Sequence, residues 1–211
     1  MKDIKLVIFD LDGTLFRTET VDIRAINDAL AKNGYEVKSD DEILNVIGLT
    51  LKEVCKVLIN KVDEDDINQF SKDIISFEKP YISEYGELYD GVLNSLNALK
   101  GRGYILCICS NGNKEYVLGI SKKVKLFDIF DDICFSRDGI CKTQAVGILK
   151  HKYEVDSFIM VGDRTSDIEA TLLNGGISIG VSYGFGKDEI LLANYVANNI
   201  QEVERIIMSI Y

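Results

Sequence analysis

The 211-residue sequence has no apolar stretch near the roughly 20 residues that are needed to span a bilayer. Only about five apolar residues precede Asp10, which is too few for the apolar region of a secretory signal peptide. We therefore expect a cytoplasmic protein without membrane association. With 46% hydrophobic residues, the chain can still bury a sizeable core.

Histidine, proline and paired cysteines are also scarce. The single histidine, His151, lies late in a helical pattern, which excludes Ser-His-Asp catalysis. The single proline is Pro80. The five cysteines form no CxxC pair, so they indicate no zinc site, and we interpret them as reduced thiols.

Positive charge is in the minority, with 24 Lys and Arg against 34 Asp and Glu and a formal net charge of −10. Such a chain repels the phosphate backbone of a polynucleotide, so we expect no nucleic-acid partner. A small anionic substrate stays compatible with this charge, because a bound cation can reverse the local potential.

Short apolar runs indicate strands that are buried on both faces of a parallel sheet. They are Leu6–Phe9, Tyr104–Cys109, Phe158–Val161 and Ile177–Val181, with a weaker fifth run at Ile129–Phe135. Segments with helical spacing follow the later runs, at Lys114–Lys122, Thr143–Lys152 and Ser166–Leu173. This alternation predicts an α/β protein with a doubly wound, Rossmann-like parallel sheet, which binds its ligand at the carboxyl ends of the strands.

The interval between the first two strands is too long for a simple crossover. More than 90 residues separate Phe9 from Tyr104, whereas a βαβ unit needs only about 30. The surplus has helical spacing at Val21–Ala31 and Ile67–Phe77, and capping boxes start at Ser39 and Thr50. The acidic run at 63–66 suits a solvated helix start. We expect a helical cap domain at 16–88 and a core domain made of 1–15 and 89–211.

Two carboxylates follow directly on the first buried strand, in the segment Asp10-Leu11-Asp12-Gly13-Thr14. Alternation along an extended chain sends Asp10 and Asp12 to the same side. Their mutual repulsion calls for compensation, and a divalent cation is the usual solution. Gly13 permits the tight exit from the strand that this placement requires.

The segment from Asp10 to Leu15 resembles the first motif of the haloacid dehalogenase (HAD) superfamily, and the later motifs follow in that family's order. Ser110-Asn111 is similar to the second motif and Lys142 to the third. The segment Gly162-Asp163-Arg164-Thr165-Ser166-Asp167 is similar to the fourth. The resemblance covers nearly the whole chain and departs at Thr143, where the family commonly has proline.

The resemblance implies magnesium-dependent phosphoryl transfer. Asp10 is expected to be the nucleophile and Asp12 the general acid and base, with Ser110 and Lys142 completing the catalytic set. The expected substrate-binding residues are Gly13, Thr14, Asn111, Gly112, Gly48 and Thr50. The expected Mg²⁺ ligands are Asp10, Asp12 through its carbonyl, Asp163 and Asp167.

Within the superfamily, Asp12 favours phosphatases and phosphomutases, because dehalogenases lack an acid at this place. The stretch 48–52 has no arginine of the kind with which β-phosphoglucomutase-like members hold a second phosphate. The segment 181–186 resembles the phosphoglycolate phosphatase branch. We therefore expect a phosphatase for a small phosphorylated metabolite of the phosphoglycolate type, as a monomer or homodimer. A phosphomutase, a 5′-nucleotidase or pyrophosphatase, and a non-catalytic binding protein are the alternatives.

The cap is expected to close over the site and exclude water from the reaction. The residues expected near the substrate are Arg17, Glu19, Gly48, Leu49 and Thr50.

Overall fold

The computed structural model describes residues 5–60, 63–135, 137, 139–186 and 188–210. Within these residues, six parallel strands form one sheet in the order β3-β2-β1-β4-β5-β6. The strands are β1 (Leu6–Phe9), β2 (Ile105–Cys109), β3 (Asp132–Cys134), β4 (Ile159–Gly162), β5 (Ile177–Val181) and β6 (Tyr195–Ala197). The prediction of a doubly wound α/β fold is confirmed.

Most strand predictions match the structure. The runs predicted at 6–9 and 177–181 are β1 and β5 without change. Strand β2 begins one residue later than predicted, and β4 begins and ends one residue later. The fifth run shortens to the three residues of β3. The edge strand β6 was not predicted, because it is three residues long and two of them are exposed, which leaves no apolar run to detect.

Nine α-helices and one 3₁₀ helix lie in the described part of the chain. They are α1 (Glu19–Lys32), α2 (Asp40–Leu44), α3 (Leu51–Ile59), α4 (Glu64–Tyr85), α5 (Val92–Gly101), α6 (Lys114–Lys123), α7 (Lys142–Lys152), α8 (Thr165–Leu173), η1 (Glu189–Leu192) and α9 (Ile200–Ile210). None of these helices combines the length and the apolar character that a membrane crossing requires.

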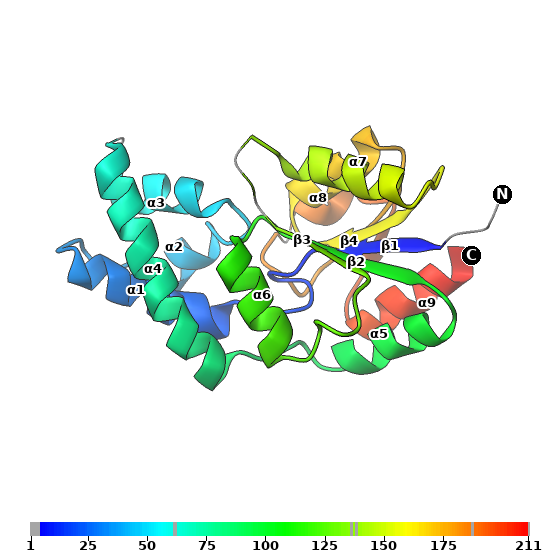
Figure 1. Cartoon of the computed structure of the whole chain (residues 1–211), viewed down its shortest axis with the longest axis horizontal. Coiled ribbons are helices and arrows are strands. Elements are labelled where there is room, and N and C mark those ends of the chain that lie inside the picture. The colour runs from blue at the N-terminus through cyan, green and yellow to red at the C-terminus, as the bar shows by residue number, and fades with distance from the viewer. Residues whose placement is uncertain (1–4, 61–62, 136, 138, 187, 211) are drawn as a thin grey trace.

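The helices of the core cover both faces of the sheet (Figure 1). Val7 and Phe9 of β1 pack in a cluster with residues of α5, α6 and α9 on one face. Leu6 and Ile8, which alternate with them along the strand, pack in a second cluster with residues of α7 and α8 on the other. Burial on both faces explains why β1 reads as a continuous apolar run.

Helices α1 to α4, called the insert below, lie beside the end of the sheet that is opposite the two chain termini (Figure 1). They have a hydrophobic cluster of their own, with Leu30, Ile43, Phe70 and Ile74 among its buried members. Both predicted capping boxes are present, and Asp63 caps α4 as the acidic run suggested. Helix α4 extends beyond its predicted range and contains Pro80 in its interior.

The two crossings between insert and core pair with each other. Phe16 and Leu88 form an antiparallel bridge, flanked by hydrogen bonds from Arg17 N to Glu87 O (3.0 Å) and from Tyr89 N to Leu15 O (3.0 Å). This pairing lies at the boundaries that were predicted at 15/16 and 88/89, although the division into two domains stays a prediction.

Candidate active site

The motif residues meet at the carboxyl edge of the sheet. Asp10 follows β1, Ser110 follows β2, and Asp163 follows β4. The strand order reverses between β1 and β4, which is the switch point where doubly wound sheets bind ligands. Strand order therefore brings together side chains that are more than 150 residues apart in sequence.

Three buried carboxylates form a cluster of the kind that binds a metal ion. Asp10, Asp163 and Asp167 each offer an oxygen atom, and these three oxygens lie within 4.8 Å of one another. Asp10 Oδ2 and Asp163 Oδ1 are buried without any hydrogen-bond partner in the structure. Buried polar atoms are nearly always paired, so these two oxygens mark a place for a cation.

Asp163 is held by backbone groups that approach it closely. The amide of Phe185 donates a 2.7 Å hydrogen bond to Asp163 Oδ2. Gly13 has φ +73°, and a Cβ there would lie 2.6 Å from the same oxygen, so only glycine fits. Burial, and then the neighbouring Asp167 carboxylate, raise the pKa of Asp163 to about 7.

Lys142 lies between two of the clustered carboxylates. Its Nζ is 2.7 Å from Asp10 Oδ1 and 2.7 Å from Asp167 Oδ1, and all three side chains are buried. Burial alone would lower the pKa of Lys142, but the carboxylates of Asp10 and Asp167 outweigh it and raise this pKa. A permanent cation is thus placed against the carboxylate that was predicted to be the nucleophile.

Asp12 is surrounded by hydroxyl groups. Thr18 and Tyr116 donate hydrogen bonds to Asp12 Oδ1 at 2.8 and 2.7 Å, and Ser110 donates to Oδ2 at 3.2 Å. Burial raises the pKa of Asp12, although the hydrogen bonds from Tyr116 and Thr18 oppose that shift. A raised pKa keeps a carboxyl group protonated at higher pH, which suits a general acid.

A pocket of about 50 Å³ lies where the insert faces these carboxylates. Gly48 and Leu49 line it, as do Asn111 and Gly112. Thr50 does not: its side chain belongs to the capping box of α3 and lines two neighbouring pockets. Arg17 pairs with Glu19 and Glu87 and is likewise outside the lining, as is Glu19.

The profile of the haloacid dehalogenase-like hydrolases matches residues 7–181, which include all four motifs from Asp10 to Asp167. The chain belongs to this family. The family resemblance and the enzyme class expected from the sequence, a hydrolase of the phosphatase type, are confirmed.

Individual proteins and a solved structure resemble this chain over most of its length. A phosphoglycolate phosphatase from Agrobacterium fabrum is 28% identical over 189 residues, covering 85% of this chain and 81% of that protein. A 5′-nucleotidase from Pseudomonas aeruginosa is 26% identical over 197 residues, covering 89% and 87%. The crystal structure of a predicted phosphatase from Clostridium acetobutylicum superposes with a TM-score of 0.88 at 27% identity and covers 98% of this chain and 99% of that one.

In this hydrolase, Arg164 connects the loop of the fourth motif to the insert. Its guanidinium donates to the carbonyl oxygens of Leu44 (3.0 Å) and Ile47 (2.6 Å), and it pairs with Glu189 at 2.7 Å. Asn111 adds a second link, since its amide donates to Gly48 O at 2.8 Å. These bonds hold the loop 44–48 of the insert over the site.

Sequence reasoning did not find Thr18, Tyr116 or the role of Arg164. Tyr116 belongs to a helix that was predicted, but nothing in its spacing shows that its hydroxyl reaches Asp12, 104 residues away. The available signal for Arg164 was its position in the fourth motif, where a basic residue stands between Asp163 and Asp167 without a role of its own. Its partners in the insert are main-chain carbonyl groups, which leave no mark in the sequence.

Proposed function

We propose that this protein is a magnesium-dependent phosphatase that hydrolyses a small phosphorylated metabolite through an aspartyl-phosphate formed on Asp10. The observation that carries the proposal is the buried cluster of Asp10, Asp163 and Asp167 with Lys142 bound into it. Phosphoryl transfer needs chiefly positioning and the neutralisation of charge, and this cluster provides for both.

The donor atoms of the cluster fit Mg²⁺. They are all carboxylate oxygens, which are the ligands that Mg²⁺ prefers, and two of them have no other partner. Asp10 and Asp163 would bind the ion directly and the Asp12 carbonyl would join them. Asp167, which is engaged by Lys142 and by the Arg164 amide at 3.0 Å, would ligate it directly or hold one of its waters. When bound, the ion offsets the negative charge of the phosphoryl group.

Asp10 would act as the nucleophile in the first of two displacements. Its carboxylate attacks phosphorus, the bond from phosphorus to the leaving oxygen breaks, and Asp12 gives its proton to that oxygen. In the second step Asp12 takes a proton from water, the water oxygen attacks phosphorus, and the aspartyl bond breaks to regenerate Asp10. Lys142 stays protonated and stabilises the negative charge in both steps.

The phosphoryl oxygens would be bound at the end of β2. The Ser110 hydroxyl accepts a 2.9 Å hydrogen bond from the Gly112 amide, which fixes the turn that follows. The hydroxyl of Thr14 is buried without a partner close to the same edge of the sheet. These groups, with the backbone of Gly13 and Asn111, make up the expected phosphate-binding set.

The insert would serve as a cap that supplies contacts to the leaving group. Gly48 and Leu49 reach the pocket, which supports the expectation that this loop approaches the substrate. The names of the relatives place phosphoglycolate and nucleoside monophosphates on the first substrate panel. A non-catalytic binding role is disfavoured because binding alone gives no use to Asp12.

The test is phosphate release with and without Mg²⁺ from phosphoglycolate, hexose phosphates, nucleoside monophosphates and pyrophosphate. Asp10→Asn should abolish release, whereas Asp156→Asn, a matched change at an exposed position, should not affect it. Release that persists in Asp10→Asn, or that ignores Mg²⁺, would refute the proposal. Turnover only in the presence of a sugar bisphosphate would indicate a phosphomutase instead.

A further inference from the structure

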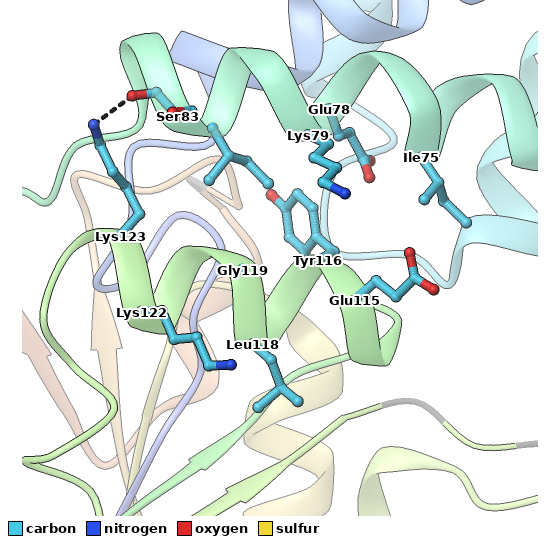
Figure 2. Close-up of a pocket in the computed structure, with 11 residues that line it drawn as sticks. Ile75, Glu78, Lys79, Ser83, Glu115, Tyr116, Leu118, Gly119, Lys122 and Lys123 are labelled. Carbon is cyan, nitrogen blue, oxygen red and sulfur yellow. Dashed lines mark hydrogen bonds between the residues drawn. The ribbon is translucent and has the colours of Figure 1, made fainter.

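Two carboxylates of the insert line the pocket of about 50 Å³ together with the predicted catalytic pair. Asp22 of α1 and Glu78 of α4 line it together with Asp10 and Asp12. Glu78 lies where α4 faces α6, beside the ring of Tyr116, as Figure 2 shows. The roles proposed above account for Asp10 and Asp12 and make no use of Asp22 or Glu78.

One oxygen of each of these two side chains lacks, among the described residues, the partner that a buried carboxylate oxygen normally has. Glu78 is only 6% exposed, and its Oε2 atom has no hydrogen-bond partner. Asp22 Oδ1 is also buried and unpartnered. Burying a carboxylate without a partner is costly, and apolar side chains of similar size would stabilise the fold better. A ligand that provides the missing donors would account for their presence.

Among the residues that the structure describes, the pocket is lined by acidic side chains without basic ones. Four acidic side chains line it, and none of the lining residues in the described part of the chain is Lys, Arg or His. Lys142 forms ion pairs with Asp10 and Asp167 and is not part of this lining. A leaving group with a carboxylate of its own would find no cation among the described residues of this lining to bind it.

The pKa directions agree with this close grouping. Burial, followed by the charge of Asp12, raises the pKa of Glu78 to about 8. Burial and then Glu78 raise the pKa of Asp22 well above its ordinary value. Both acids therefore hold their protons to higher pH in the free protein, and a positive charge that enters the pocket favours their ionised forms.

We propose that Asp22 and Glu78 form a leaving-group subsite that selects phosphate esters of small amino alcohols. The proposal rests on the phosphatase function proposed above and names its substrate class. An ammonium group has three donors and the opposite charge, so it satisfies both orphan oxygens. The pocket volume of about 50 Å³ limits the leaving group to a few non-hydrogen atoms.

Four phosphate esters of similar size test whether the pocket prefers an ammonium group. 2-Aminoethyl phosphate, 2-hydroxyethyl phosphate, ethyl phosphate and phosphoglycolate differ in the terminal group of a two-carbon leaving group. We expect kcat/KM with Mg²⁺ to fall in that order. Because a hydrogen bond to a charged group changes affinity roughly 10- to 100-fold, the ammonium ester should exceed ethyl phosphate by about that factor. Phosphoglycolate turned over as well as the ammonium ester would overturn the subsite.

Isosteric variants test the two residues themselves. Glu78→Gln and Asp22→Asn should each lower kcat/KM for 2-aminoethyl phosphate and narrow its advantage over phosphoglycolate. Glu84→Gln removes the same charge from an exposed position on the same helix and should leave the order unchanged. An unchanged order in Glu78→Gln and Asp22→Asn, with both proteins folded by circular dichroism, would contradict the assignment.

Binding to inactive protein separates this inference from the proposed function. Calorimetry on Asp10→Asn with Mg²⁺ should give the same order of affinity for the four esters. If the wild-type protein hydrolyses phosphoglycolate best, the subsite is wrong and the phosphatase stands. If it hydrolyses none of the four but releases phosphate from another compound of the panel, the subsite is also wrong and the phosphatase stands. If it releases phosphate from no compound of the panel, both proposals are wrong.

Discussion

The guanidinium of Arg164 donates a 2.6 Å hydrogen bond to the carbonyl oxygen of Ile47, 117 residues away. Arg164 stands between the two acids of the fourth motif, and Ile47 precedes the glycine of the insert loop. Gly48 has φ +93°, which residues with a side chain rarely adopt, and a Cβ there would lie 3.0 Å from Arg164 Cγ, so the loop favours glycine at this position. The residue that links the fourth motif to the insert is therefore part of the motif itself.

We predict that Arg164→Lys weakens this link. Lysine cannot contact two carbonyl oxygens and Glu189 with one planar group, so the loop 44–48 should lose its fixed position. Steady-state kinetics should show kcat/KM lowered about tenfold, the effect of losing one charge-assisted hydrogen bond. Arg205→Lys, at an exposed position of α9, is the matched control and should behave as the wild type.

Tyr116→Phe should lower kcat with little change in KM. The variant removes the 2.7 Å hydrogen bond that orients Asp12 but keeps the ring that fills the core. Because an ionised acceptor is involved, we expect a loss of roughly tenfold or more. Tyr195→Phe on the exposed edge strand provides the comparison. If kcat fell equally in Tyr116→Phe and Tyr195→Phe, the hydrogen bond from Tyr116 to Asp12 would have no specific part in the reaction.

Addition of Mg²⁺ should raise the melting temperature. An ion that binds only the native state at 100 times its Kd adds about 2.7 kcal/mol of stability. For a chain of this length, that corresponds to roughly 5–10 °C. Differential scanning fluorimetry of the wild type and Asp163→Asn checks the site, because the variant lacks one of the orphan oxygens. The same shift in Asp163→Asn would place the ion elsewhere.

Gly13→Ala should destabilise the protein and impair the metal site together. Alanine at φ +73° costs roughly 1–2 kcal/mol, and its Cβ would press on Asp163 Oδ2. Gly34→Ala has the same sign of φ but no neighbour within 4 Å, so it carries the backbone cost alone. Chemical denaturation should therefore show both variants weakened, and only Gly13→Ala should lose the stabilisation by Mg²⁺.

The stability of the metal-free protein should fall as the pH rises from 4.5 to about 8 because of Glu78. The native state holds a proton on this buried carboxyl over that window, whereas the unfolded chain releases it, so the stabilisation present below pH 4.5 is lost as the pH approaches 8. Urea unfolding across this range should show a weaker pH dependence in Glu78→Gln than in Glu84→Gln. Identical slopes would mean that Glu78 is not buried in the native state.

The sequence by itself determined the fold class and pointed to the acids and the lysine that the structure brings together at the carboxyl edge of the sheet. Strands such as β1 are apolar on both faces because helices cover both sides of the sheet, and that burial is visible as a run of Leu, Val, Ile and Phe. Asp10, Ser110 and Asp163 were found because each directly follows such a run. The capping boxes at Ser39 and Thr50 were found because their bonds are local.

Only the tertiary structure decided which side chains surround these acids. The contacts of Thr18 and Tyr116 with Asp12, and the placement of Asp22 and Glu78 in one pocket, arise from the packing of α1, α4 and α6 at the end of the sheet. The contact of Arg164 with the insert loop arises where the start of α8 meets the loop after α2. No periodicity records contacts between residues that distant in sequence. Their energies come from burial and hydrogen bonding, which depend on neighbours in space rather than along the chain.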